Sequence, residues 1–462
     1  MSDYEAHIKR KLSTVPPTGI IGHVDLPESL FQHQEALTRW SLRRGRSAVF
    51  ADTGLGKMRI ELAWGSAVHK YTRMPVMIHT PLAVAGQIAA EGAKIGIHAK
   101  VVRDAGDLID GINIANYERL HKFDASVFGG VVLDESGCIK HHDTKTFSSL
   151  TEAYRDTPFK LPATATPAPN DWTELGTHAE FLGICTRQEM LAEFFTHDGG
   201  DTSVWRLKGH ARQVFWRWVA SWGAMIRKPS DLGFDDGLYN LPPLHLHEHT
   251  VDFEMPLNGM LFAAEAQSLS ERRKARRESL KDRVEACAAM VNSQGSEPWV
   301  VWCDLNAEGD ALTAAIDGAI QIAGADSIDV KESRLADFSY GRARVLVSKP
   351  SICGYGLNWQ HSARMAFVGV TDSYESFYQA VRRQWRFGQK RDVHVHIFSS
   401  KAEGAVVANL RRKERDAGLM ADNLSAETRD AVMAEVIGMQ RETNPYNASK
   451  RVALPEFLRT AA

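Results

Sequence analysis

The chain has little of several features that mark specialised classes of protein. Only five of its 462 residues are cysteine, and no two of these are spaced as a CxxC pair. The absence of paired cysteines argues against a zinc knuckle or a disulfide framework and fits a reducing cytoplasm. The first residues, MSDYEAHIKRKL, lack an apolar signal core, and no apolar run approaches the roughly 18 residues that span a bilayer. We therefore expect a soluble, cytoplasmic protein that contacts no membrane.

An excess of charge of one sign is also absent. Lysine and arginine number 55 against 57 aspartates and glutamates, which gives a formal net charge of −2. Any basic surface for nucleic acid must therefore be local. Hydrophobic residues make up 44% of the chain, as in soluble globular proteins, and the length predicts two domains with room for a tail.

What the sequence does contain is two series of short apolar runs, each alternating with helical patterns. The first series comprises residues 47–52, 75–80, 99–104, 112–117, 130–135 and 159–164, and the second comprises 298–303, 343–348, 364–370 and 393–398. Continuous apolar strands that alternate with helices are typical of parallel sheets covered on both faces. The sequence thus predicts an α/β fold with two tandem parallel-sheet lobes.

The predicted boundaries follow changes in composition along the chain. We expect a first lobe over 1–250 with a helical, aromatic-rich insertion at about 172–240, a helical linker or protrusion over 251–295, a second lobe over 296–403 and a helical tail over 404–462. The sequence contains neither an internal repeat nor a low-complexity tract. The chain is therefore expected to consist of ordinary folded lobes joined by helical segments.

Two smaller patterns have more than one interpretation. Phe215, Trp218 and Trp222 repeat at helical spacing, which favours a buried helix face over base stacking. The stretch LHLHEHT (244–250) places three histidines on one face of a possible strand. Because no further metal ligand lies nearby, we favour an exposed edge strand over a metal site.

A glycine-rich loop follows the first predicted strand. Gly54-Leu55-Gly56-Lys57 lies between an apolar run and a helical pattern. Glycines allow backbone N–H groups to surround phosphate oxygens, and the helix N-terminus favours anions. Lys57 would neutralise the terminal phosphates of a nucleotide. By itself, the loop is equally compatible with an ordinary turn between a strand and a helix.

A later apolar run that ends in two carboxylates strengthens the nucleotide interpretation. In VVLDESG (131–137), the apolar residues are followed directly by Asp134 and Glu135. Asp134 can hold Mg²⁺, usually through water, and Glu135 can polarise an attacking water. The alternative is a strand that ends in a polar turn. In this order, the loop and the carboxylates together predict a nucleoside triphosphate site.

The order of the short motifs resembles that of the superfamily-two helicase ATPases. It reads Q…GLGK…TP…NYE…DES…TATP…N…GYGLN…QAxxRxxRxGQ over roughly residues 26–400. Within this group the chain looks most like the Swi/Snf-type translocases of double-stranded DNA, and the most diagnostic stretch is YQAVRRQWRFGQKRDVHVHIF (378–398). The stretch from IRKPSDLGF to LPPL resembles the end of the first lobe in compact, phage- or prophage-type members. For a viral source, the compartment would be the host cytoplasm.

The resemblance implies two tandem RecA-like lobes that share one site for ATP and Mg²⁺. The first lobe would bind the nucleotide through Gln34, Thr53, Gly54, Leu55, Gly56, Lys57 and Met58, with Gln34 reading the adenine edge, and the metal through Asp134. The second lobe would supply Arg383 and Arg386 as arginine fingers, with Gln379 beside them. Thr164 and Thr166 would couple hydrolysis to lobe movement. Catalysis would then depend on closure of the lobes, because an arginine finger is worth about 10³–10⁵ in rate.

Nucleic-acid contacts are expected, by the same resemblance, from loops at the ends of strands. The residues that match are Thr80, Pro81, Asn116, Tyr117, Ser348, Lys349 and Gly354. Hydroxyl, amide and cationic groups at such positions bind phosphate oxygens without reading sequence. The alternative for each residue is that it merely ends a strand.

Two positions depart from the family pattern. Met58 stands where a hydroxyl normally ligates Mg²⁺, and Gly137 stands where a histidine often helps to couple the lobes. Mg²⁺ can still be held by phosphates, water and Asp134. Asp52 or Thr53 could compensate only in part. We therefore expect an active enzyme, either slow or with weakened affinity for the metal.

These features together predict a nucleic-acid-stimulated ATPase that moves along double-stranded DNA, displacing proteins or remodelling DNA structures. The near alternative is a strand-separating DNA or RNA helicase. The alternative of another class is a DNA-binding protein that binds nucleotide without hydrolysing it, with Met58 as the disabling change. We expect a monomer, and the tail could recruit protein partners.

Overall fold

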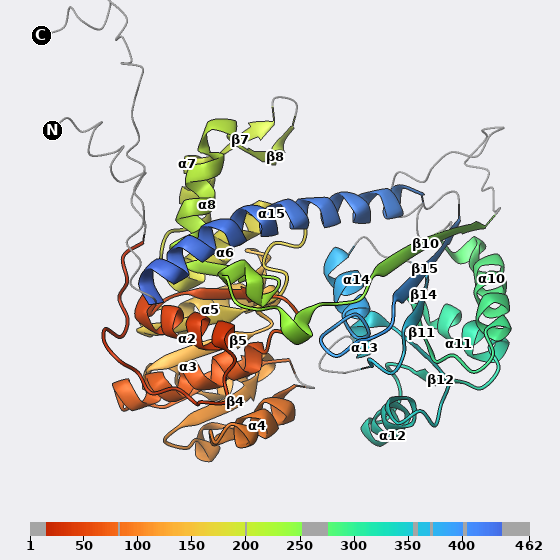
Figure 1. Cartoon of the computed structure of the whole chain (residues 1–462), viewed down its shortest axis with the longest axis horizontal. Coiled ribbons are helices and arrows are strands. Elements are labelled where there is room, and N and C mark those ends of the chain that lie inside the picture. The colour runs from red at the N-terminus through yellow and green to blue at the C-terminus, as the bar shows by residue number, and fades with distance from the viewer. Residues whose placement is uncertain are drawn as a thin grey trace, which may run out of the picture.

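The computed structural model describes residues 15–81, 84–198, 201–251, 276–353, 359–369, 373–400 and 404–436. It contains two α/β lobes side by side, with a long helix lying across both (Figure 1). Each lobe has its own parallel sheet, so the predicted fold class of two tandem parallel-sheet α/β lobes with a helical C-terminal region is confirmed. Gly354, which was expected to contact nucleic acid, lies outside the described residues.

The sheet of the first lobe has seven strands within the described ranges, in the order β3-β4-β2-β5-β6-β1-β9, and its described pairings are all parallel. These strands are β1 (Ala48–Ala51), β2 (Val76–Thr80), β3 (Ala99–Val101), β4 (Ile112–Asn116), β5 (Gly130–Asp134), β6 (Phe159–Ala163) and β9 (Gly223–Ile226). Alternate residues of β1 enter different cores: Phe50 packs in one cluster and Val49 in another. The sheet is therefore buried on both faces, as its continuous apolar strands predict.

Helices cover both faces of this sheet. They are α2 (Gln32–Arg44), α3 (Lys57–Thr72), α4 (Ala85–Lys94), α5 (Lys145–Ala153), α6 (Leu175–Leu182), α7 (Arg187–Phe194) and α8 (Arg212–Ala220). Short 3₁₀ turns join them: η1 (Ala105–Asp107), η2 (Tyr117–Lys122), η3 (Ala125–Val127), η4 (Ser136–Ile139), η5 (Trp172–Glu174), η6 (Gly209–Ala211), η7 (Pro229–Leu232) and η8 (Gly237–Tyr239). The turn η4 directly follows β5, so the acidic run of the sequence lies at the carboxyl edge of the sheet.

The segment 172–240 is only in part the helical insertion that its composition predicts. Helices α6, α7 and α8 lie in it, but so does an antiparallel hairpin of β7 (Phe195–Asp198) and β8 (Asp201–Leu207). The segment also supplies β9, which pairs with β1 at the edge of the main sheet. The predicted buried face is present, because Phe215 and Trp222 are fully buried and Trp218 packs against them.

The sheet of the second lobe has six strands in the described part of the chain, in the order β10-β15-β14-β11-β13-β12, again with parallel pairings. The strands are β10 (Leu244–Val251), β11 (Trp299–Cys303), β12 (Ala319–Ile322), β13 (Val345–Ser348), β14 (Arg364–Val368) and β15 (Val393–Ser400). The helices are α10 (Leu280–Ser293), α11 (Asn306–Ala315), α12 (Ile328–Ser339), α13 (Pro350–Cys353) and α14 (Tyr374–Val381).

The lobe boundary differs from the predicted one at residue 250. Strand β10 pairs with β15 over its whole length and therefore belongs to the second sheet. Helix α10, expected as part of a linker, buries Val284, Cys287 and Val291 in the core of the second lobe. Periodicity identified both elements but not the sheet that each one joins, because sheet membership depends on long-range pairing.

The predicted edge strand at 244–250 is confirmed as β10. Two of its three histidines lie close to histidines of β15: His247 Nε2 lies 3.0 Å from His394 Nδ1, and His249 Nε2 lies 2.9 Å from His396 Nδ1. Burial, followed by the neighbouring histidines, lowers the pKa of His396 to about 3. The imidazole rings of the two strands therefore form a stacked ladder at the sheet edge.

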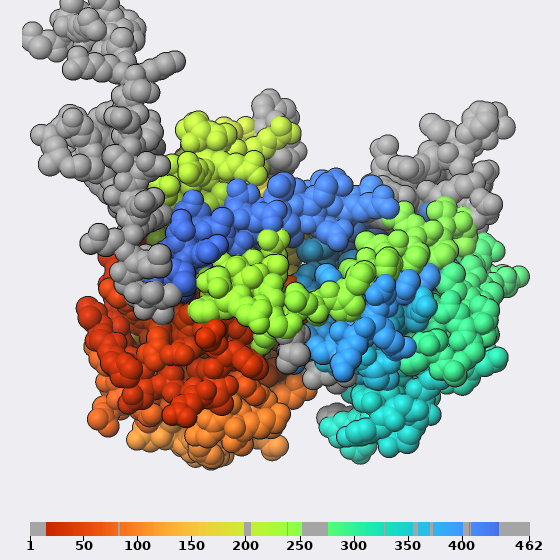
Figure 2. All heavy atoms as spheres, viewed as in Figure 1, coloured from red at the N-terminus to blue at the C-terminus, as the bar shows by residue number. Residues whose placement is uncertain are grey.

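Helix α15 (Gly404–Val436) connects the two lobes. Val406 and Leu410, near its start, belong to the core of the second lobe, whereas Met420 and Leu424 belong to a core of the first. Met225 N of β9 donates to the hydroxyl of Thr428 at 3.0 Å, which fixes the far end of the helix. Figure 2 shows the helix lying over both lobes. No described helix is long and apolar enough to cross a membrane.

Candidate active site

The glycine-rich loop joins β1 to α3 with backbone geometry that requires glycine. Gly54 and Gly56 have φ angles of 95° and 82°, in the left-handed region. A Cβ on Gly56 would lie 2.2 Å from Nε2 of Gln34, and a Cβ on Gly54 would lie 3.2 Å from Cβ of Phe387. Both glycines are therefore needed for close approach, one inside the first lobe and one between the lobes.

The side chain of Gln34 is bonded to this loop. Its Nε2 donates to the carbonyl oxygen of Leu55 at 3.0 Å, and its Oε1 accepts from the backbone N–H of Phe31 at 3.1 Å. His33 Nε2 lies 3.1 Å from the same Leu55 oxygen. The side chain of Gln34 is thus engaged in positioning the loop, and its predicted contact with adenine stays a prediction.

Asp134 lies at the end of β5 and is held by two hydroxyl groups. Thr80 donates to Oδ2 of Asp134 at 2.7 Å, and Tyr117 donates to its backbone oxygen at 2.7 Å. Burial, followed by the charge of Glu135, raises the pKa of Asp134 to about 6. The hydroxyl of Thr80 therefore fixes the orientation of this carboxyl group.

Glu135 has a left-handed backbone, with φ 53° and ψ 57°, which is rare outside glycine. Such strain is common at functional sites. Its Oε1 lies 3.8 Å from Nζ of Lys57, and its Oε2 accepts from the hydroxyl of Thr164 at 3.4 Å. The hydroxyl of Thr164 in turn accepts from the backbone N–H of Thr166 at 3.2 Å. The two predicted coupling residues are therefore connected to the carboxylate.

Sequence reasoning missed a third carboxyl group in this region, that of Glu61. It lies one helical turn after Lys57 on α3 and is fully buried. Burial and the neighbouring Asp134 raise the pKa of Glu61 well above its ordinary range. The signal in the sequence was a lone acid in the otherwise apolar run IELAW, which composition alone does not distinguish from a surface residue.

The second lobe contributes the other wall of the site. Helix α14 and the segment after it face the phosphate loop, and both lobes line one cavity of about 500 Å³. The predicted residues that line it are Gln34, Thr53, Gly54, Gly56, Lys57, Met58, Asp134 and Glu135 from the first lobe, and Gln379, Arg383 and Arg386 from the second. Leu55 is buried beneath the loop. Burial, followed by the nearby charge of Arg382, lowers the pKa of Arg386 to about 10.

Aromatic rings that the sequence did not single out also line this cavity. Phe31, Tyr239 and Phe387 come from three distant segments. Tyr239 contacts the other two rings, with centroids 6.0 Å from Phe31 and 4.9 Å from Phe387. The cavity thus combines a flat apolar part, suited to a base, with a cationic and glycine-rich part, suited to phosphates. No sequence spacing could have predicted this cluster, because the rings meet only through the fold.

The residues expected to contact nucleic acid differ in their exposure. Thr80 and Ser348 are buried; the hydroxyl of Thr80 donates to Asp134, and that of Ser348 donates to Ile322 O at 2.8 Å. Their side chains therefore support the sheet edges in this structure and do not lie on an open surface. The partly exposed members of the set are Pro81, Asn116, Tyr117 and Lys349.

The two departures from the family pattern have structural counterparts. Met58 packs against the core beneath the loop. A Cβ on Gly137 would lie 2.4 Å from Oε1 of Glu375, which forms an ion pair with Lys140. The small residue therefore leaves room for a charged contact between the lobes.

The donor atoms present are compatible with Mg²⁺. Carboxylate oxygens are the hard ligands that this ion prefers, and it usually retains several waters. Among the described residues, no three His, Cys, Asp or Glu side chains are grouped as a metal site. Asp134 would therefore hold the ion together with nucleotide phosphates and water, and the ion would supply positive charge to those phosphates. Asp52 is not available as a substitute ligand, because both of its oxygens contact the second lobe.

Comparisons with known proteins identify a likeness in structure. No family model matches the sequence, and no curated protein matches it either. A solved structure of the SWI2/SNF2 ATPase core of Sulfolobus solfataricus in complex with double-stranded DNA matches 88% of this chain and 96% of its own chain. The two are 16% identical in sequence, with a TM-score of 0.43. A likeness of this degree does not identify the reaction of the present chain.

Proposed function

We propose that the protein is a DNA-dependent ATPase that converts ATP hydrolysis into movement along double-stranded DNA. The observation that supports it most is the single cavity in which a phosphate loop and two carboxylates of one lobe face two arginines of the other. Phosphoryl transfer depends mainly on positioning and on stabilisation of charge, and both are supplied by this arrangement.

In this proposal each part of the site has one role. Lys57 and the loop amides bind the phosphates, and Glu135 orients the attacking water. Arg383 and Arg386 stabilise the charge that develops on the transferred phosphoryl group, and Gln379 lies beside them. Because the arginines come from the second lobe, hydrolysis requires closure, and cycles of closure can move the lobes along a strand.

The preference for duplex DNA rests on the motif resemblance, above all on residues 378–389. Phosphate contacts at the loop ends would give movement that is independent of sequence. Pro81, Asn116, Tyr117 and Lys349 are the partly exposed candidates for these contacts.

Steady-state ATPase assays with duplex DNA, single-stranded DNA and RNA test the proposal. We expect turnover at millimolar Mg²⁺ that duplex DNA stimulates most. Equal stimulation by RNA would contradict the assignment of the substrate. Binding of ATP without any nucleic-acid-stimulated turnover would identify a nucleotide-binding protein that does not hydrolyse. Displacement of a third strand from a duplex, without separation of the duplex itself, would distinguish a translocase from a strand-separating helicase.

A further inference from the structure

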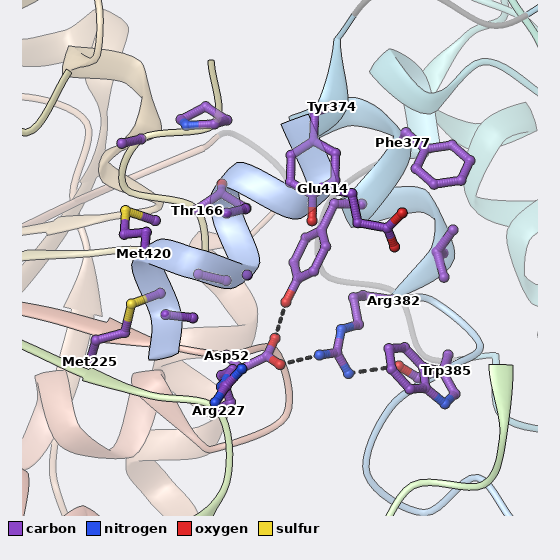
Figure 3. A pocket seen from close by; sticks show the side chains of 18 of the residues that line it. Asp52, Thr166, Met225, Arg227, Tyr374, Phe377, Arg382, Trp385, Glu414 and Met420 are labelled. Carbon is purple, nitrogen blue, oxygen red and sulfur yellow. Dashed lines mark hydrogen bonds and ion pairs between the residues drawn. The ribbon is translucent and has the colours of Figure 1, made fainter. Parts of the chain in front are cut away.

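A second cavity between the lobes, of about 220 Å³, lies beside the phosphate loop and is bordered by α14 and α15. Asp52, the first residue after β1, approaches from the first lobe, and Arg382 approaches from the second (Figure 3). The guanidinium of Arg382 forms an ion pair with one oxygen of Asp52, and the hydroxyl of Tyr378 donates to the other. Both charged residues are buried, with 8% and 7% of their surfaces exposed.

Each end of this contact is fixed to its own lobe. On the first lobe, Asp52 accepts from the backbone N–H of Thr53 at 2.6 Å, so its carboxylate is held by the loop itself. On the second lobe, the guanidinium of Arg382 lies 4.4 Å from the ring centre of Trp385 and donates to that residue's carbonyl oxygen at 3.3 Å. The indole of Trp385 donates to Pro242 O at 2.7 Å.

In the sequence, both charged residues of this contact lie next to residues of the candidate active site. Asp52 lies two residues before Gly54 of the phosphate loop, and Arg382 directly precedes Arg383. A fixed contact between them therefore sets the distance between the loop and the first arginine finger. Gly54 lies against Phe387, which directly follows Arg386, so the same segment is pressed onto the loop at its other end.

We propose that Asp52, Tyr378 and Arg382, here called the interlobe latch, are positioning residues that place the arginine fingers against the phosphate loop. The proposal rests on the proposed function, since it assigns a role within the same site. A buried ion pair adds little net stability, but removal of one partner leaves an uncompensated charge. The three residues are therefore expected to make this contact fully or not at all. Such behaviour suits a site in which the two lobes must come together before hydrolysis.

Burial also distinguishes the latch from ordinary surface pairs. The negative charge of Asp52 and the neighbouring tyrosines outweigh desolvation and raise the pKa of Arg382, and burial raises the pKa of Tyr378 well above its usual range. Arg382 therefore keeps its charge and Tyr378 keeps its proton throughout the working pH range. Separation of the lobes, and not titration of either of these two groups, is therefore what opens the latch.

The test uses Asp52→Asn and Arg382→Gln, alone and combined, in the full chain with duplex DNA. Asparagine keeps an oxygen for the Thr53 amide, so the loop itself should be retained. Each single variant should lower kcat about 10- to 100-fold while KM for ATP changes less than about threefold, because a misplacement of 1 Å can cost about 10²-fold. The combined variant should be no slower than the slower single variant, because both remove the same contact.

A second readout does not depend on activity. Spin labels on a keto amino acid, one at the exposed Glu152 of the first lobe and one at the exposed Lys281 of the second, avoid the native cysteines. In the nucleotide-free protein, the distance distribution between labels should broaden in the latch variants. The matched control is Asp326→Asn, which breaks a pair with Arg334 inside the second lobe and should change neither kcat nor the distribution.

The outcomes separate the two proposals. If the wild type shows no hydrolysis, the proposed function fails, and the distance measurement alone decides the latch. Single variants with wild-type kcat and an unchanged distribution would overturn the latch, as would kinetic losses that add in the combined variant. If neither charged variant folds, Tyr378→Phe, which removes one hydrogen bond to a charged group, should still lower kcat about tenfold; an unchanged kcat there would overturn the proposal.

Discussion

The two halves of the candidate site are held in place by different means. In the first lobe, the phosphate loop follows β1, whereas Asp134 ends β5 and Glu135 follows it. These two strands belong to one sheet, with β6 between them. The contacts that fix them are local: Gln34 bonds Leu55, and Thr80 bonds Asp134. This half is formed within its own lobe.

The second half lies in the other lobe and meets the first lobe through charged contacts. Gln379, Arg383 and Arg386 lie on or after α14, in a segment that is bonded within its own lobe, for example by Gln384 to Ser362 at 2.9 Å, and that also reaches across to the first lobe. Glu375, near the start of α14, pairs with Lys140, and Arg382, just after its end, pairs with Asp52. We therefore expect ligand binding and catalysis to be separable, because the loop and the carboxylates are held within one lobe, whereas the proposed arginine fingers can reach them only from the other lobe.

The largest effect is expected from Lys57→Ala. Loss of the only loop lysine should reduce ATPase turnover to background and weaken binding of a fluorescent ATP analogue. The lobe contacts should persist, because the described partners of Lys57, namely Ala51 O and Glu135, lie in the first lobe. Lys281→Ala is a suitable control, since Lys281 pairs with Glu285 on the outside of the second lobe. Wild-type turnover in Lys57→Ala would contradict the assignment of the loop.

Glu135→Gln should preserve binding and abolish most of the chemistry. The amide has the shape of the acid but cannot polarise water as strongly, so kcat should fall about 10²- to 10⁴-fold. Binding of the ATP analogue should stay close to that of the wild type. If kcat is unchanged while binding weakens, the carboxylate has a structural role and the comparison between the two halves must be redrawn.

Gly137→Ala tests the charged contact between the lobes. Its Cβ would displace Oε1 of Glu375 and weaken the pair with Lys140 without straining a left-handed backbone. Because such a pair is worth about 1 kcal/mol, kcat should fall about fivefold. Gly209→Ala is the matched control, since nothing lies within 4 Å of its added Cβ. Equal kinetics in the two alanine variants would show that the contact is irrelevant to closure.

The raised pKa of Asp134 predicts a specific dependence on pH. If the ionised carboxylate holds Mg²⁺ as predicted, kcat/KM for MgATP should fall as the pH drops through about 6, the pKa to which burial raises this group from 3.8. An acid limb displaced to about pH 4 would contradict the buried state of Asp134.

The raised pKa of Asp134 has the opposite effect on folding stability, which should increase as the pH falls. Above pH 6 the buried negative charge destabilises the folded state, and this cost disappears as the folded protein takes up its proton between about pH 6 and 4. Asp134→Asn should therefore be more stable than the wild type at pH 7, and the difference should vanish near pH 4 in thermal unfolding.

Much of the architecture could be predicted from local sequence. Apolar runs gave the positions of strands in both sheets, and the residues Gly54 to Lys57 and Asp134 to Glu135 lie where motif order placed them. Short-range patterns predict these features because neighbouring residues determine strand burial and loop geometry.

The remaining features depend on contacts between distant parts of the chain. The transfer of β10 to the second sheet, the packing of α15 on both lobes and the cluster of Phe31, Tyr239 and Phe387 all arise from pairing over long separations. Asp52, predicted from the sequence to compensate in part for the missing metal ligand, instead contacts Arg382. Residues 404–436, the described part of the tail, pack against both lobes. The recruitment of protein partners through the tail stays a prediction.

The most direct test of the composite site is the duplex-stimulated ATPase rate of Arg386→Ala at saturating ATP. If the second lobe supplies the arginine fingers, kcat should fall about 10³- to 10⁵-fold while the first lobe still binds ATP. A kcat within about threefold of the wild type would contradict a site completed by the second lobe.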